Sequence, residues 1–153
     1  MRKITIVALL VLALGGCATT SQYGNFVPPT AAINQQQLAR EAAQQLAVLY
    51  PPAQTRLELQ QATPDAFGQA LVLTLRERGY ALLEFDSARA KAQDTAASSP
   101  TSPAGLPLRY VLDQVGDSNL YRLTLSLGNQ SITRPYLVQG GSFAPAGYWV
   151  RKE

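Results

Sequence analysis

Cysteine and histidine, the side chains most used for nucleophilic and metal chemistry, are almost missing from this chain. Cys17 is the one cysteine, and there is no histidine. This inventory excludes Ser-His-Asp triads, Cys-His pairs and the common zinc sites. The motifs GxSxG, GxxxxGK[ST] and GxGxxG are absent too. We therefore predict a protein that is not an enzyme, with no metal site and no small-molecule substrate.

Two weaker patterns could still carry chemistry or binding. Glu84 and Asp86 are the closest carboxylate pair, and paired carboxylates serve glycosidases. They stand at the end of a predicted strand beside a loop, where we expect them to be solvated rather than catalytic. The aromatic pair Tyr148–Trp149 fits a binding surface, since both types are enriched at interfaces, or packing against the core. We favour packing.

The residues before Cys17 suggest why it is there. Two basic residues and an apolar run over residues 4–14 precede Gly15 and Gly16, which is typical of a secretory signal peptide. The run is about half of the ~20 residues that a spanning helix needs. The stretch Leu14-Gly15-Gly16-Cys17 resembles the bacterial lipobox. The alternative is an ordinary signal peptide with a cysteine nearby by chance.

The lipobox resemblance implies a lipoprotein. Residues 1–16 are then a signal peptide, and Cys17 carries a covalent diacylglycerol and an N-acyl chain such as palmitate, with no other cofactor. Several acyl chains hold a protein stably on a bilayer. Ala18 is not the Asp that retains such proteins at the inner membrane. We expect the periplasmic face of the outer membrane.

Composition sets further limits. Without residues 1–16, 137 of the 153 residues remain, enough for one small domain. The mature side chains sum to +1, because 11 basic residues oppose 10 acidic ones once Arg2 and Lys3 are removed. This near neutrality gives no reason to expect direct nucleic-acid binding.

The predicted domain covers residues 34–153, behind a flexible tether over residues 17–33 that could span ~50 Å. Tyr23, Phe26 and Val27 are unusual in a spacer. They fit either a segment that folds back on the domain or a docking peptide for a partner.

Periodicity predicts the elements of the domain. A helix with one apolar stripe is predicted over residues 35–50, and Asn34 is its N-cap. A strand–helix–strand unit is predicted next. It consists of a strand over 55–60, a helix that is capped by Thr63 and runs to Arg78, and a strand over 80–85. Gly68 inside this second helix indicates a close packing contact. Leu73 lies off its main apolar face.

Residues 87–106 read as a flexible Ala/Ser/Pro loop. Alternating runs at 108–115, 120–127 and 131–138 then predict an antiparallel meander, with turns at Asp117–Asn119, Gly128–Asn129 and Gly140–Gly141. Pro135 suggests an edge or a bulge in the third run. Residues 148–153 could add a fourth strand. The sum is an α+β domain.

The ordered segments "YGNFV", "LYPPAQTRLELQQATPDAFGQALVLTLRERGY", "LPLRYVLDQVGDSNLYRLTL", "NQSITRPY" and "PAGYWVRKE" resemble the TrbH conjugal transfer lipoprotein family. The resemblance implies a plasmid-encoded component of mating-pair formation in a type IV secretion system. It also implies a likeness to the N-terminal modules of secretins, a hetero-oligomeric ring with other secretion proteins, and docking through Tyr23, Asn25, Phe26 and Val27.

Two other functions stay open on the sequence. A regulatory envelope lipoprotein that activates a cell-wall synthase, or assists another exporter, would use a similar core on a tether. An envelope hydrolase is the third, and the residue inventory gives little support to it.

Overall fold

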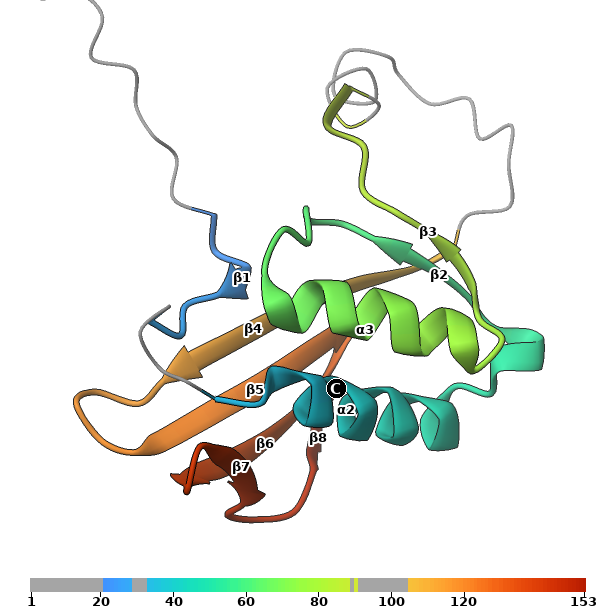
Figure 1. Ribbon diagram of the computed structural model, residues 1–153. Helices are drawn as coiled ribbons and strands as arrows, with labels where there is room; N and C mark the ends of the chain where they lie inside the picture. The colour runs from blue at the N-terminus through green and yellow to red at the C-terminus, as the bar shows by residue number, and fades with distance from the viewer. Residues whose placement is uncertain (1–20, 29–32, 89, 91–104) are drawn as a thin grey trace, which may run out of the picture.

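The structure is a computed structural model that describes residues 21–28, 33–88, 90 and 105–153. Cys17, the predicted signal peptide and most of the predicted loop lie outside the described residues. Within them, helices α2 (Gln35–Leu49) and α3 (Ala66–Glu77) lie side by side on one face of a mixed sheet (Figure 1). The expected α+β fold is confirmed.

The sheet has the strand order β3-β2-β4-β5-β6-β7, while β1 pairs with β4 and β8 with β6. Strands β1, β2 and β3 pair in parallel with their neighbours, whereas the strands from β4 to β8 pair with one another in antiparallel fashion. The strand bounds are β1 Gly24–Asn25, β2 Arg56–Leu59, β3 Ala81–Leu83, β4 Leu106–Gln114, β5 Leu120–Leu127, β6 Gln130–Gln139, β7 Ser142–Pro145 and β8 Val150–Lys152.

Helix α2 forms as the sequence predicts. The Asn34 side chain accepts a hydrogen bond from the backbone N–H of Gln37 at 3.2 Å, which satisfies one free donor of the first turn. One stripe of the helix is buried against the sheet, and it consists of Leu38, Ala39, Ala42, Ala43 and Leu46.

Helix α3 begins later than predicted. Asp65, not Thr63, is the N-cap, because its carboxylate accepts the backbone N–H of Gly68 at 2.9 Å. At the other end, Gly79 has φ +85°, the left-handed conformation common after a helix. The helix connects β2 to β3, which lie parallel to each other as a strand–helix–strand unit requires.

The antiparallel meander is confirmed, with one strand that the sequence did not reveal. Gly128 has φ +58° in the turn between β5 and β6, and Gly140 and Gly141 have φ +56° and +75°. The last two form a two-residue hairpin turn, which positive φ at both positions favours. That turn leads into β7, a strand of four residues that pairs with the end of β6.

Pro135 does not mark an edge, since β6 has partners on both sides. On one side it pairs with β5 along its length. On the other, β7 pairs with residues 136–139 and β8 with residues 131–133. Pro135 falls between them, where its carbonyl accepts the N–H of Ala146 at 3.0 Å. Because proline has no N–H to donate, the ladder to β7 ends there.

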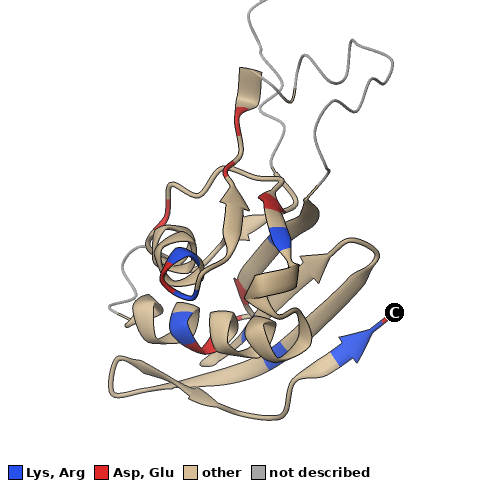
Figure 2. Cartoon of the chain, turned by 90° about the vertical axis from the view of Figure 1, so that its right-hand side faces the viewer, with Lys and Arg blue, Asp and Glu red and all other residues tan. Residues whose placement is uncertain are grey.

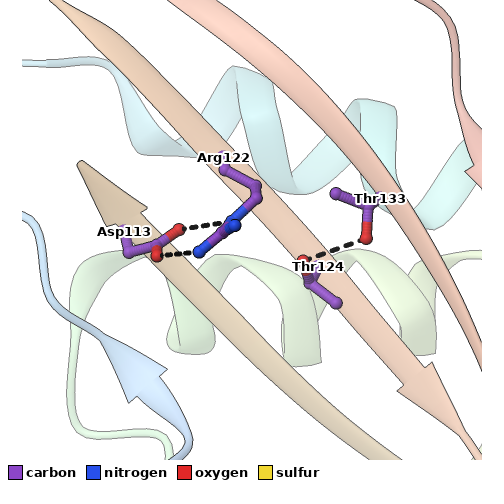
Figure 3. A network of polar contacts seen from close by, with 4 residues as sticks. All are labelled: Asp113, Arg122, Thr124 and Thr133. Atoms are coloured by element: carbon purple, nitrogen blue, oxygen red, sulfur yellow. Dashed lines mark hydrogen bonds and ion pairs between the residues drawn. The ribbon is translucent and has the colours of Figure 1, made fainter. Parts of the chain in front are cut away.

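The sheet has two different faces. The face under the helices carries fully buried side chains from β2 and the three long strands, together with Phe67, Leu71 and Leu75 of α3. We call the opposite face of the sheet the outer face. Asp113, Arg122, Thr124 and Thr133 lie on it, as Figure 3 shows with the helices behind the strands. The charged residues of the described chain are dispersed along its helices, strands and loops (Figure 2).

Candidate assembly site around the N-terminal strand

The segment predicted as a tether contains part of the sheet. Gly24 and Asn25 pair in parallel with Val111 and Leu112 of β4, and the N–H of Phe26 donates to the Leu112 carbonyl at 2.8 Å. Val27 is buried in the core. The domain therefore starts before residue 34, and this segment folds back on it, as one of the two interpretations had it.

Strand β1 continues a row that β2 begins. Both strands lie on the same edge of β4, β2 opposite residues 106–108 and β1 opposite residues 111–112. Between them the N–H of Tyr110 would lack a strand partner. The Gln61 side chain fills this gap, because its carbonyl oxygen accepts that N–H at 3.0 Å. The Gln61 Nε2 is buried and has no partner among the described residues.

Gly24 directs the segment to both faces of the sheet. Its backbone φ of +140° is an angle that residues other than glycine rarely adopt. Tyr23, before it, has its ring 5.0 Å from the Arg109 guanidinium carbon, which lies on the outer face. Asn25, after it, reaches the helices on the covered face. The N-terminal segment therefore makes side-chain contacts on both faces of the sheet.

A polar cluster fixes Asn25 to both helices. Its Nδ2 donates to Gln35 Oε1 at 2.7 Å and to Asp65 Oδ1 at 3.1 Å, and its Oδ1 accepts the N–H of Val27 at 3.0 Å. Asp65 also accepts the hydroxyl of Tyr110 at 2.5 Å. One carboxylate thus caps α3, holds the N-terminal strand and satisfies a buried phenol of β4.

A second polar cluster ties α2 to β6. The Glu41 carboxylate pairs with Arg134 and accepts the hydroxyl of Tyr136 at 3.0 Å. Arg134 Nε donates to the Gly147 carbonyl at 2.7 Å, and its guanidinium lies over the Trp149 ring. Arg134 thus connects Glu41 of α2 with the C-terminal segment, and the cluster holds that segment against the helix layer.

The two clusters shift the acidity of their tyrosines. Burial, and then the hydrogen bond to Asp65, raise the pKa of Tyr110 well above its ordinary value. Burial and the Glu41 charge raise the pKa of Tyr136 in the same way. Both side chains are fully buried. The folded protein therefore keeps both phenols neutral at pH values where the unfolded chain ionises them.

We predict a loss of stability in alkali from these two groups. A raised folded pKa contributes stability that is present below pH ~10 and lost above it, at up to about 1.4 kcal/mol per pH unit for each group. Urea unfolding between pH 8 and 11.5 measures this. The double variant Tyr110→Phe and Tyr136→Phe should be less stable at pH 8 but show a shallower slope above pH 10. Equal slopes would contradict the prediction.

The predicted docking residues have different environments. Tyr23 is partly buried on Arg109, Asn25 is held by the helices, and Val27 is buried. Phe26 is 50% exposed, so it alone of the four presents much free side-chain surface. Docking through this segment stays a prediction.

The other residues singled out from the sequence also have clear positions. Glu84 pairs with Arg76 on the surface, and Asp86 accepts the N–H of Ala88. Trp149 packs against the core, as favoured for the pair, but the prediction was wrong for Tyr148, which is 90% exposed. The sequence did not reveal the structural roles of Gln61, Asp65 and Glu41, because each bonds to residues far along the chain.

The described residues include no group of three or more metal-ligating carboxylates, cysteines or histidines. A groove of about 360 Å³ runs between the solvent-facing sides of α2 and α3, and its lining includes Gln36, Arg40 and the exposed Leu73. Each carboxylate of the two clusters is bonded to partners within the domain. In the described part of the chain, no helix is long and apolar enough to cross a membrane.

The fold and its clusters define a small two-layer α+β domain whose polar groups join its own elements together. The family described as "Conjugal transfer protein TrbH" matches residues 20–153. The chain therefore belongs to the TrbH family of conjugal transfer proteins, and the resemblance seen in the sequence is confirmed. No curated protein and no solved structure matches the chain, so the likeness to secretin modules stays a prediction.

Proposed function

We propose that this protein is an outer-membrane lipoprotein that acts as a structural component of a conjugative type IV secretion apparatus. The family establishes a role in conjugal transfer. The anchoring role comes from the signal-like residues 1–16 and the lipobox cysteine that follows them. The observation that carries the proposal is the family match over nearly all of the chain after Cys17.

The structure supports assembly rather than catalysis. The carboxylates that could do acid–base work are bonded inside the domain or solvated, and Glu41 and Asp65 each hold several elements together. A rigid domain that starts a few residues after an acylated cysteine would present fixed surfaces at the periplasmic side of the membrane. Such surfaces suit a subunit of a hetero-oligomeric ring.

An affinity purification tests this proposal. We would tag the full chain, purify it from detergent-solubilised donor membranes and identify the proteins that accompany it by mass spectrometry. Channel proteins of the secretion system are the expected partners. Recovery of a cell-wall synthase instead would favour a regulatory lipoprotein. The matched control is the same chain with Cys17→Ser, which should recover fewer partners if assembly occurs at the membrane.

A further inference from the structure

The outer face of the sheet carries its apolar side chains at one end. Phe26 is 50% exposed and Val115 is 42% exposed. Two partly exposed residues, Leu120 and Leu137, belong to the same face by strand alternation, because a neighbour of each along its strand is buried under the helices. We call these four residues the apolar end.

The hydrogen-bond register places the four residues together. The N–H of Phe26 bonds to the Leu112 carbonyl, so Phe26 lies beside Asp113 at the edge of β4. The N–H of Val115 donates to the Leu120 carbonyl at 2.8 Å, and Leu120 lies opposite Leu137 on β6. Val115, Leu120 and Leu137 therefore form one row across the end of the sheet, and Phe26 flanks this row beside the next one, which holds Asp113 and Arg122.

The adjoining part of the outer face is polar. Arg122 pairs with Asp113 through two hydrogen bonds, and the hydroxyls of Thr124 and Thr133 lie 3.0 Å apart (Figure 3). The change from polar to apolar thus runs along the strands, toward the end where Phe26 and Val115 lie. A face graded in this way suits contact at one end only.

The position of Cys17 identifies what meets that end. Tyr23 comes six positions after Cys17, and six steps of the chain span at most about 20 Å in any conformation. Tyr23 is fixed on Arg109, and β1 leads directly to Phe26. An acylated Cys17, which is the proposed function, would hold this side of the domain near the lipid headgroups. The ~50 Å reach expected for a free tether is not available once β1 is part of the sheet.

From this geometry we infer that the apolar end rests on the lipid surface to which Cys17 is anchored. Aromatic and aliphatic side chains at the end of a rigid sheet can enter the boundary between headgroups and acyl chains. The nearby charges, Asp113 and Arg122, neutralise each other, and Asp117 lies in the turn beyond. The contact is therefore apolar rather than electrostatic, and it should not require anionic lipid.

Tryptophan fluorescence in vesicles tests this contact. We would produce the full, acylated chain with Trp149→Phe, which removes the one native tryptophan, and add Phe26→Trp. The vesicles contain phosphatidylethanolamine and phosphatidylglycerol, with or without bromine on the acyl chains near the glycerol. We expect bromine to lower the emission of this variant about twofold, because the new side chain would lie at the headgroup boundary.

A control variant carries Val48→Trp in the same background. Val48 is 72% exposed, and it lies on α2 thirteen residues from Gln35, which contacts Asn25. At 1.5 Å per residue, it is about 20 Å from Gln35 along the helix, and α2 covers the face of the sheet opposite the apolar end. Its emission should hardly respond to bromine. Adding Val115→Asp to the Phe26→Trp variant should weaken the quenching, and circular dichroism checks that each variant is folded.

The outcomes separate this inference from the proposed function. If mass spectrometry shows an acylated Cys17 and bromine leaves the Phe26→Trp emission unchanged, the lipid contact is refuted while the anchor stands. Shielding of that tryptophan from acrylamide in the purified transfer complex, without quenching by brominated lipid, would assign the apolar end to a protein partner. A Cys17 that carries no lipid would refute both.

Discussion

Replacing Cys17 by serine is expected to abolish acylation and to keep the folded domain from being anchored at the outer membrane. Each buried CH₂ contributes ~0.8 kcal/mol to binding, and a serine hydroxyl cannot replace the thiol in this modification. The domain itself should not change, since its first strand begins at Gly24. Cell fractionation, with mass spectrometry of residue 17, measures the result.

A second variant makes this test decisive. Cys17→Ser also blocks the proposed cleavage before residue 17, so the apolar run over residues 4–14 stays attached and can retain the chain at the inner membrane. A chain that starts at Ala18 behind an ordinary cleavable signal lacks both the lipid and this run. We expect it in the soluble periplasmic fraction, with the same circular dichroism as the acylated protein.

The matched control for both variants is Thr19→Ala, which leaves the lipobox intact. It should fractionate with the membrane like the original chain. The experiment is done in cells without other transfer proteins, because partners could retain an unanchored domain. If the variant that starts at Ala18 still sediments entirely with membranes in such cells, the anchoring role of Cys17 is wrong.

Local sequence signals predicted the parts of the fold that depend on neighbouring residues. Asn34 caps α2, Gly79 follows α3, and two glycines form the turn before β7. Each of these positions needs only a short side chain or a positive φ, which the residue type itself reports. The alternating strands were equally clear, because one face of each is buried under the helices.

Pairing between distant segments was not visible in the sequence. Strand β1 has two residues, too few for any periodicity, and the parallel partner it needs lies more than 80 residues further on. The same holds for Asp65 and Glu41, whose partners Tyr110 and Tyr136 are 45 and 95 residues away. A carboxylate and a phenol give no pattern until the fold brings them together. The candidate site is therefore a product of tertiary structure.

The start of α3 shows how one such contact changes a local choice. Thr63, Pro64 and Asp65 are all suitable at a helix start, and the preference of proline for the first helical position favours Thr63 as the cap. Asp65 becomes the cap because its second oxygen is also engaged by Tyr110 and its first by Asn25. A threonine hydroxyl could not accept from all three groups at once. Tertiary contacts thus decided between two residues that the sequence left nearly equal.

Gly68→Ala should lower the free energy of unfolding by about 2–3 kcal/mol, although alanine is the better helix former by about 1 kcal/mol. A Cβ at this position would lie 2.8 Å from the Thr63 Cβ and closer still to the hydroxyl oxygen of Tyr110. Tyr110 is fully buried and bonded to Asp65, so it cannot move away cheaply. The steric overlap therefore reverses the usual sign of a glycine-to-alanine change in a helix.

A double-mutant cycle isolates the cause. Tyr110→Phe removes the oxygen nearest to the new methyl group, so Gly68→Ala should cost at least about 1 kcal/mol less in that background. Leu73→Ala on the same helix is the control; Leu73 is 60% exposed, and we expect a change within about 0.5 kcal/mol. Urea unfolding of the four proteins gives the coupling. An equal cost in both backgrounds would show that Tyr110 is not the obstacle, and a stabilising Gly68→Ala would show that α3 does not approach β4 as closely as the structure has it.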